Sequence, residues 1–405
     1  MPETAENYGG IIEEIVCEDR ISFLPEDLLV TILLYIPTKE AVATMILSKR
    51  WFYIWTMLPR LDYRDNNDDE IKKSVWWFLE NSLQLHKAPV LPMLIIELGP
   101  QCPSDADVGK CVAKAVDHRV IFLRLGLLWS ADPTSLPKTL YSCGSLKVLT
   151  LSDKILVDVP CTACLPSLRT LDLNSVVYKN ENSLIRLLSS CPVLKSLLVK
   201  RNKDDNVKKF KDTGRCVVID TPALSEFDFF DHSGDSCSIE NTLCFEKVSI
   251  DVYLPIPDLD KFLRSFSAVL FLELNLNDEM ILPWDSDWMD SLVPFLKNIP
   301  KLKCLIVDYG STDEPPNASA LWSESDKDPE CLSSSLEKFE LIDYTGREEE
   351  KELVEYILTT SKCLKTATIS LRSLPDLKLE DKAKMIEELK AIPRVSKTSQ
   401  LLFIT

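Results

Sequence analysis

Apolar side chains recur along most of the chain at the spacing Leu-x-x-Leu-x-Leu. The clearest copies begin at Leu146, Leu168, Leu194, Leu224, Leu302 and Leu336, and weaker copies begin at Phe245, Val269 and Leu364. Alternating apolar positions of this kind predict one short β-strand per unit. Amphipathic stretches at residues 184–191, 259–266, 289–299 and 353–360 lie between the strands and predict helices.

These units predict an α/β repeat protein. Successive units start about 21 to 34 residues apart, close to the period of leucine-rich repeats. Because one strand and one helix cannot bury their apolar faces alone, neighbouring units must stack into a curved solenoid. An ordinary α/β domain is the alternative, but the repeated spacing disfavours it. Two polar segments, residues 202–214 and 310–329, are expected to be loops.

The segment at residues 21–55 has the pattern of a compact helical unit. Apolar residues at helical spacing predict a first helix, Pro37 must end it, and Thr38 is a candidate N-cap for a second helix. Ser48 can cap a third helix, which carries Trp51, Phe52 and Trp55. These large side chains exceed what so small a unit can bury, so a partner is expected to cover them.

The motifs ISFLPEDLL at 21–29, IPTKEAV at 36–42 and LSKRW at 47–51 resemble the F-box. The resemblance implies a three-helix module that docks onto the Skp-type adaptor of a cullin-based ubiquitin ligase. Phe52 and Tyr35 depart from the residue types common in plant members. Nine residues fall at its adaptor-facing or core-forming positions: Leu24, Pro25, Leu28, Ile32, Leu33, Val42, Leu47, Trp51 and Trp55.

The C-terminal part resembles the FBD region of plant F-box proteins. The carrying motifs are LEKFEL at 336–341, EEEKELVEYIL at 348–358 and PRVSKTSQLLF at 393–403, with LQLHKAP at 83–89 also typical of that group. We therefore expect an acidic tail (1–20), an F-box (21–65), a leucine-rich-repeat solenoid (66–330) and an FBD-like region (331–405). The last region is expected to close the solenoid's open end.

Charge and composition narrow the partners. The 405 residues carry a formal net charge of -17, so nucleic acid and anionic membrane surfaces are not expected partners. No segment offers the roughly 18 apolar residues that a membrane span requires. The 13 cysteines are scattered through apolar stretches, and with no secretory signal we expect reduced thiols in the cytoplasm or nucleus.

The sequence offers little chemistry. With 10 glycines and 3 histidines, most phosphate-binding and acid-base sites lose support. Cys161 and Cys164 form a single Cys-x-x-Cys pair, which is only half of the ligand set of a zinc site. The acidic run at 65–70 lacks the glycine and late glutamate of a calcium loop. The three histidines, His86, His118 and His232, lie in unrelated contexts, and Trp76 and Trp77 are expected to pack inside. We predict no catalytic residue, metal or cofactor.

Three functions remain open. The first is a substrate receptor of a Skp-cullin-F-box (SCF) ubiquitin ligase, which holds a target protein by proximity and not by catalysis. The second is an F-box scaffold that binds the adaptor without assembling a ligase. The third is an enzyme with a site on the repeat surface, which a cluster of perturbed polar residues in one pocket would support.

Residues between and after the core leucines should line the concave face, because strand side chains alternate. This column is mostly acidic, against only Lys200, Lys247 and Lys338, and a target presenting Lys or Arg is favoured. The alternative is that an acidic protein shows acid on every face. The candidate target-binding residues are Asp172, Glu226, Asp228, Asp251, Glu273, Asp308 and Glu340.

Overall fold

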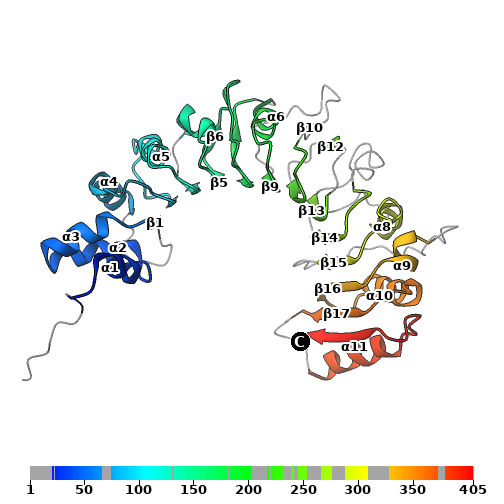
Figure 1. The fold of residues 1–405 in the computed structure, drawn as a ribbon. Helices are drawn as coiled ribbons and strands as arrows, with labels where there is room; N and C mark the ends of the chain where they lie inside the picture. The colour runs from blue at the N-terminus through cyan, green and yellow to red at the C-terminus, as the bar shows by residue number, and fades with distance from the viewer. Residues whose placement is uncertain are drawn as a thin grey trace, which may run out of the picture.

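The computed structural model describes residues 21, 23–65, 74–129, 132–180, 182–201, 217–218, 221–231, 239–240, 245–252, 266–275, 288–308, 328–372 and 379–404. The chain forms an open arc in which the strands line the inner side and the helices lie outside (Figure 1). The segments 202–214 and 310–327, expected to be loops, and the acidic tail lie outside the described residues.

One parallel sheet of 13 strands runs through the arc, and its order follows the sequence apart from short strands that belong to other sheets. Its strands are β1 (Arg60–Arg64), β2 (Met93–Leu98), β3 (Phe122–Leu127), β5 (Val148–Asp153), β7 (Thr170–Asn174), β9 (Ser196–Arg201), β11 (Glu226–Asp231), β13 (Lys247–Val252), β14 (Phe271–Asn275), β15 (Cys304–Asp308), β16 (Lys338–Tyr344), β17 (Thr366–Leu371) and β18 (Gln400–Ile404).

The repeated apolar spacing builds this sheet. Leu146, Leu149 and Leu151 are fully buried, and the corresponding residues of later units lie in the same continuous core. Three earlier strands were not predicted, although each shows the same spacing and full burial. The first apolar residue of each pattern precedes its strand and the other two lie in it: Leu58, Leu61 and Tyr63 at β1, Leu91, Leu94 and Ile96 at β2, and Val120, Leu123 and Leu125 at β3.

The outer layer is helical. It contains α4 (Trp76–Leu85), α5 (Val108–Asp117), η2 (Lys138–Ser142), α6 (Asn182–Ser189), α8 (Trp288–Lys297), α9 (Glu330–Ser334), α10 (Glu348–Thr360) and α11 (Leu379–Ala391). Of the four predicted helices, 184–191, 289–299 and 353–360 coincide largely with α6, α8 and α10, whereas 259–265 lie outside the described residues. None of the described helices is long and apolar enough to cross a membrane.

Short strands follow several of the long ones. β4 (Thr134–Ser135), β6 (Ile155–Val157) and β8 (Val177–Tyr178) form a second parallel sheet, and β10 (Val217–Val218) pairs with β12 (Ile239–Glu240). Their periodicity is too short to be detected beside the main pattern, since β4 and β8 contain two residues each.

The helical unit at the N-terminus consists of α1 (Glu26–Leu33), α2 (Thr38–Ala43), the single 3-10 turn η1 (Thr44–Ile46) and α3 (Lys49–Thr56). Ser48 caps α3, as predicted, because its hydroxyl oxygen accepts a hydrogen bond from the backbone N–H of Trp51 at 3.4 Å. The prediction for Thr38 is wrong, because Pro37 occupies the N-cap of α2. The Thr38 hydroxyl instead accepts a hydrogen bond from the backbone N–H of Asp62 in β1.

This unit is joined to the sheet without a gap in the core. The carbonyl of Thr56 accepts from the backbone N–H groups of Lys87 and Ala88, at 2.9 and 3.0 Å. Asp65 accepts from the N–H of Gly99 at 2.8 Å and from that of Val75 at 2.5 Å, so β1, β2 and α4 meet at one carboxylate. The helices and the first strands are therefore held as one body.

A buried carboxylate organises the start of α10. Glu350 is fully buried and accepts four hydrogen bonds, from the backbone N–H groups of Thr345, Gly346 and Arg347 and from the Thr345 hydroxyl. Burial raises the pKa of Glu350, and these donors oppose the increase. Because every oxygen has a partner, the group fixes the turn between β16 and α10.

Candidate docking surfaces

The N-terminal helices carry an exposed apolar face. Among the described residues, 11 of the 20 exposed large apolar side chains lie at positions 21–53. Leu28 and Ile32 on α1 are 50% and 43% exposed, and Leu47 before α3 is 63% exposed. Folded chains rarely leave so many apolar side chains together in water unless a partner covers them. The face is therefore suited to docking another protein.

The nine residues predicted for adaptor binding divide by exposure. Leu28, Ile32, Leu47 and Pro25 are exposed, and Leu24 and Trp51 are partly buried. The other three, Leu33, Val42 and Trp55, are buried in the core of the unit. A buried side chain cannot touch a docked partner directly, so these three can support binding only by holding the helices in place.

From β1 to β17, charged and uncharged residues alternate along the middle row of the sheet's inner face. Residues at equivalent register are charged on every second strand: Asp62 on β1, Arg124 on β3, Asp172 on β7, Asp228 on β11, Glu273 on β14 and Glu340 on β16. The intervening strands place uncharged residues there: Ile95, Thr150, Leu198, Ser249, Ile306 and Thr368. The row ends with Leu402 on β18.

All seven acidic residues predicted for target binding occupy this inner face, because each sits an even number of residues from the middle row. Asp172, Asp228, Glu273 and Glu340 lie in that row, Glu226 lies two residues before it, and Asp251 and Asp308 two residues after it. Asp251 is only 8% exposed, so it is poorly placed to contact a target. The other six are at least partly exposed.

Burial and mutual repulsion raise the pKa values of the central carboxyls. The pKa of Asp228 is raised by burial; Lys247 opposes this increase, and Glu226 and Asp172 add to it. Burial likewise raises the pKa of Glu273, which also experiences the charges of Asp228, Asp308 and Glu340. These carboxyls therefore interact across the strands, and an added cation would relieve their repulsion.

Cations on the protein offset part of this charge. Lys338 forms an ion pair with Glu340 at 2.8 Å, and the charge of Lys247 opposes the increase that burial causes in the pKa values of Asp228 and Glu273. Asp172 accepts a hydrogen bond from the Thr150 hydroxyl at 3.1 Å. Six partly exposed carboxylates against Lys200, Lys247 and Lys338 leave the central inner face net acidic.

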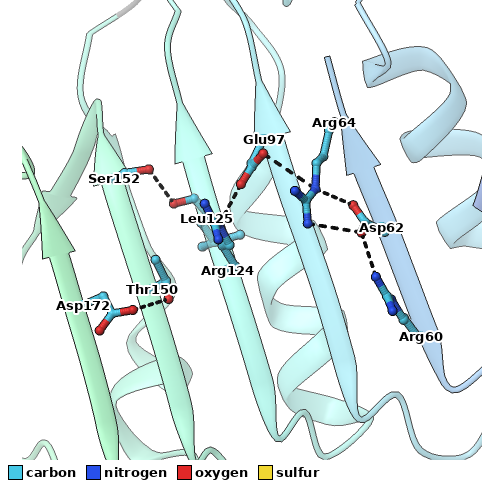
Figure 2. Close-up of polar contacts among 9 residues, drawn as sticks. All are labelled: Arg60, Asp62, Arg64, Glu97, Arg124, Leu125, Thr150, Ser152 and Asp172. Atoms are coloured by element: carbon cyan, nitrogen blue, oxygen red, sulfur yellow. Dashed lines mark hydrogen bonds and ion pairs between the residues drawn. The ribbon is translucent and has the colours of Figure 1, made fainter. Parts of the chain in front are cut away.

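The first strands differ, because their charges neutralise one another (Figure 2). Asp62 pairs with Arg60 at 3.2 Å and with Arg64 at 2.9 Å, while Glu97 pairs with Arg124 at 2.6 Å and Arg64 at 3.7 Å. Acidic residues thus do not cover the inner face evenly. The net acidic region begins at β7, which argues against a uniform distribution of acid on this face.

The other candidate sites have structural roles or remain single. The rings of His86 and His118 lie 6.3 Å apart, contrary to the expectation of unrelated contexts, but both bond backbone carbonyls, those of Leu58 and Ala88. His232 lies outside the described residues. Cys161 and Cys164 are exposed free thiols, and no group of three metal-binding side chains occurs in the part of the chain that the structure describes.

The paired tryptophans separate. Trp76 is buried at 4% exposure, as expected, whereas Trp77 is 64% exposed on the outer face of α4. Adjacent helical residues point about 100° apart, so both could not face the core. The helical spacing of the segment would have revealed this, since Trp76, Leu79 and Leu83 already complete one buried face.

Comparison with known proteins agrees with this arrangement. Profiles of the F-box domain, of the LRR repeats of an FBD-associated F-box protein and of the FBD region match residues 21–63, 111–258 and 324–369. A relative from Arabidopsis thaliana named as an FBD-associated F-box protein is 52% identical, over 97% of this chain and 99% of its own length. The chain belongs to the F-box/FBD/LRR-repeat family.

Two further Arabidopsis thaliana relatives carry the name F-box/FBD/LRR-repeat protein. One is 44% identical over 97% of both chains, and the other is 43% identical over 96% of this chain and 92% of its own. In this F-box/FBD/LRR-repeat protein, the sheet extends beyond the matched repeats. It begins at β1, which overlaps the end of the F-box match, and continues through β18 after the FBD match.

Proposed function

We propose that this F-box/FBD/LRR-repeat protein is a substrate receptor of an SCF ubiquitin ligase. Its F-box binds a Skp-type adaptor, and through it a cullin, while the inner face of the sheet binds a target protein. The observation that carries the proposal is the presence of two separate surfaces, one apolar and one acidic, that no described segment covers, on a continuous core. The protein contributes proximity and no catalytic group.

The junction supports this division of labour. A receptor must hold its target at a defined place relative to the ubiquitin-charged enzyme, and a flexible connection would dilute that effect. Here β1 is the last part of the F-box match and also the first strand of the sheet, and Thr38 bonds its backbone. The two surfaces should therefore move together.

The FBD region has a structural role in the proposal. Ala367 and Ile369 of β17, Leu364 just before that strand, and Leu389 of α11 continue the core toward its C-terminal end. We infer that residues 331–405 close the solenoid, while 1–20, 21–65 and 66–330 form the tail, F-box and repeats. Action in the cytoplasm or nucleus is part of the same proposal.

A scaffold that binds the adaptor without a ligase is the second candidate, and it shares the exposed F-box face. Co-purification separates the two. A receptor recovered from plant cells should bring the adaptor and a cullin together, whereas a scaffold should bring the adaptor alone. Preparations that contain stoichiometric adaptor but no cullin would favour the scaffold.

Substitution of the apolar face tests adaptor binding directly. Leu28→Ala with Ile32→Ala should weaken binding by roughly 30-fold or more, because buried apolar anchors carry most of the energy of such interfaces. Trp77→Ala, which removes a similarly exposed apolar side chain outside the F-box, is the matched control and should bind normally. Pull-down with purified adaptor measures both. Wild-type binding by the folded double variant would refute the assignment of this face.

A further inference from the structure

The spacing of charges on the inner face limits the kind of segment it can hold. Adjacent strands lie about 4.8 Å apart, so carboxylates on alternate strands are separated by about 9.6 Å. Four such positions follow one another without interruption, at Asp172, Asp228, Glu273 and Glu340. This regular series lies on a sheet face that no described segment covers (Figure 1).

Curvature shortens the spacing that a ligand meets. The sheet lines the inner side of the arc, so side chains that point inward converge (Figure 1). The distance between successive carboxylate groups is therefore somewhat below the backbone value of about 9.6 Å. A ligand must repeat its cations at this distance or slightly less to meet each carboxylate.

Regular backbone conformations differ in their ability to do so. A polyproline II segment rises about 3.1 Å per residue with three residues per turn, so every third side chain lies on one face about 9.3 Å apart. An α-helix returns to the same face after seven residues, about 10.5 Å along its axis. A β-strand places residues three apart on opposite faces. The three-residue period of the polyproline II conformation therefore matches the spacing of the carboxylates best.

Apolar contacts are available beside the charges. Phe271 on β14 is 47% exposed, and Leu198 and Ile306, between the acidic strands, are partly exposed. Such side chains can pack against proline rings and against the methylene groups of lysine. We infer that the inner face takes an extended, polyproline II segment of the target with Lys or Arg at every third residue. The inference rests on the proposed function and names its substrate class.

Synthetic peptides test the spacing on the full-length protein. The probes are a fluorescent peptide of four Lys-Ala-Pro triplets, a peptide of the same composition with its four lysines adjacent, and a helical peptide with lysines at a seven-residue period. At low salt the triplet peptide should bind about tenfold more tightly than either other peptide, since only it can align every charge. Equal affinities, a preference for another peptide, or no binding would overturn the inference.

Leu198→Glu separates spacing from charge. It adds a carboxylate between Asp172 and Asp228 in the same row. If only net charge mattered, all three peptides would bind more tightly by a similar factor. If spacing matters, the advantage of the triplet peptide over the adjacent-lysine peptide should shrink severalfold. An unchanged ratio would overturn the inference, whereas the proposed function is judged separately by capture of the cellular target.

Discussion

Two surfaces that the described residues leave open differ in chemistry. The F-box face is apolar, with Leu28, Ile32 and Leu47 exposed, whereas the inner face between β7 and β16 is a series of carboxylates relieved in part by lysines. An apolar interface draws its energy from burial, and a charged one from long-range attraction. The same core thus presents one surface that should be insensitive to salt and pH and another that should respond to both.

Charge reversal should produce the largest separation between the surfaces. Asp228→Lys with Glu273→Lys changes the two central carboxylates and should weaken target binding by roughly tenfold or more, while adaptor affinity stays within twofold. Exchange of a neutralised pair, Glu97→Arg with Arg124→Glu, alters the same face without changing its net charge. It serves as the matched control in surface plasmon resonance. Equal losses of target affinity in both variants would mean that the net charge of this face does not determine target binding.

Added salt should also affect the two surfaces differently, but by a smaller factor than charge reversal. Raising NaCl from 50 to 300 mM shortens the Debye length to about 40% of its starting value, so target affinity should fall severalfold. The apolar F-box contact should change by less than about twofold. Calorimetric titrations of both partners across this range provide the comparison. A target affinity independent of salt would contradict an electrostatic inner face.

Acid should weaken target binding at a higher pH than ordinary carboxyls would predict. The pKa values of Asp172, Asp228 and Glu273 are all raised, chiefly by burial. Since a cationic target binds the ionised form, affinity is complete well above the raised pKa values and declines as pH falls through them. Asp228→Asn should flatten the decline, as measured by peptide titration between pH 7.5 and 5. Adaptor binding should not share this profile.

Loss of the negative charge on these carboxyls should increase the stability of the fold, although it weakens target binding. This effect on stability should be the smallest. A carboxyl whose folded pKa exceeds its unfolded value costs stability when ionised, and that cost is lost as pH falls. Asp228→Asn should therefore raise the melting temperature at pH 7 by about 1 °C, since the group is partly screened by solvent. Glu97→Gln, which breaks ion pairs, should not raise it. A lower melting temperature for Asp228→Asn would show that this carboxylate stabilises the fold.

Local patterns in the sequence predicted the elements whose neighbours repeat them. The spacing of Leu168, Leu171 and Leu173 predicts a buried strand because the same three positions face the core in every unit. The same spacing occurs at Leu58, Leu61 and Tyr63, but that segment also completes the F-box, so the spacing alone does not assign it to the sheet. A strand can belong to both, and only its pairing with β2 shows this.

Features that depend on contacts distant in sequence were not predictable in this way. The Thr38 hydroxyl accepts a hydrogen bond from the backbone N–H of Asp62 and does not cap its own helix. The His86 ring lies near the ring of His118, which is distant in sequence. The alternation of charged and uncharged residues across the strands likewise could not be predicted without the strand register, because segments of different length separate the units. The seven acidic residues could be assigned to one face from their spacing, but their division into three rows could not.

The central claim is that one rigid body carries two independent docking surfaces. The most direct test measures adaptor and target binding by the same purified protein in three forms: wild type, Leu28→Ala with Ile32→Ala, and Asp228→Lys with Glu273→Lys. We expect the first double variant to lose only the adaptor and the second to lose only the target, with wild type capturing both in one ternary complex. Loss of both partners by either folded variant, or undiminished target capture by the charge-reversed variant at low ionic strength, would contradict the account.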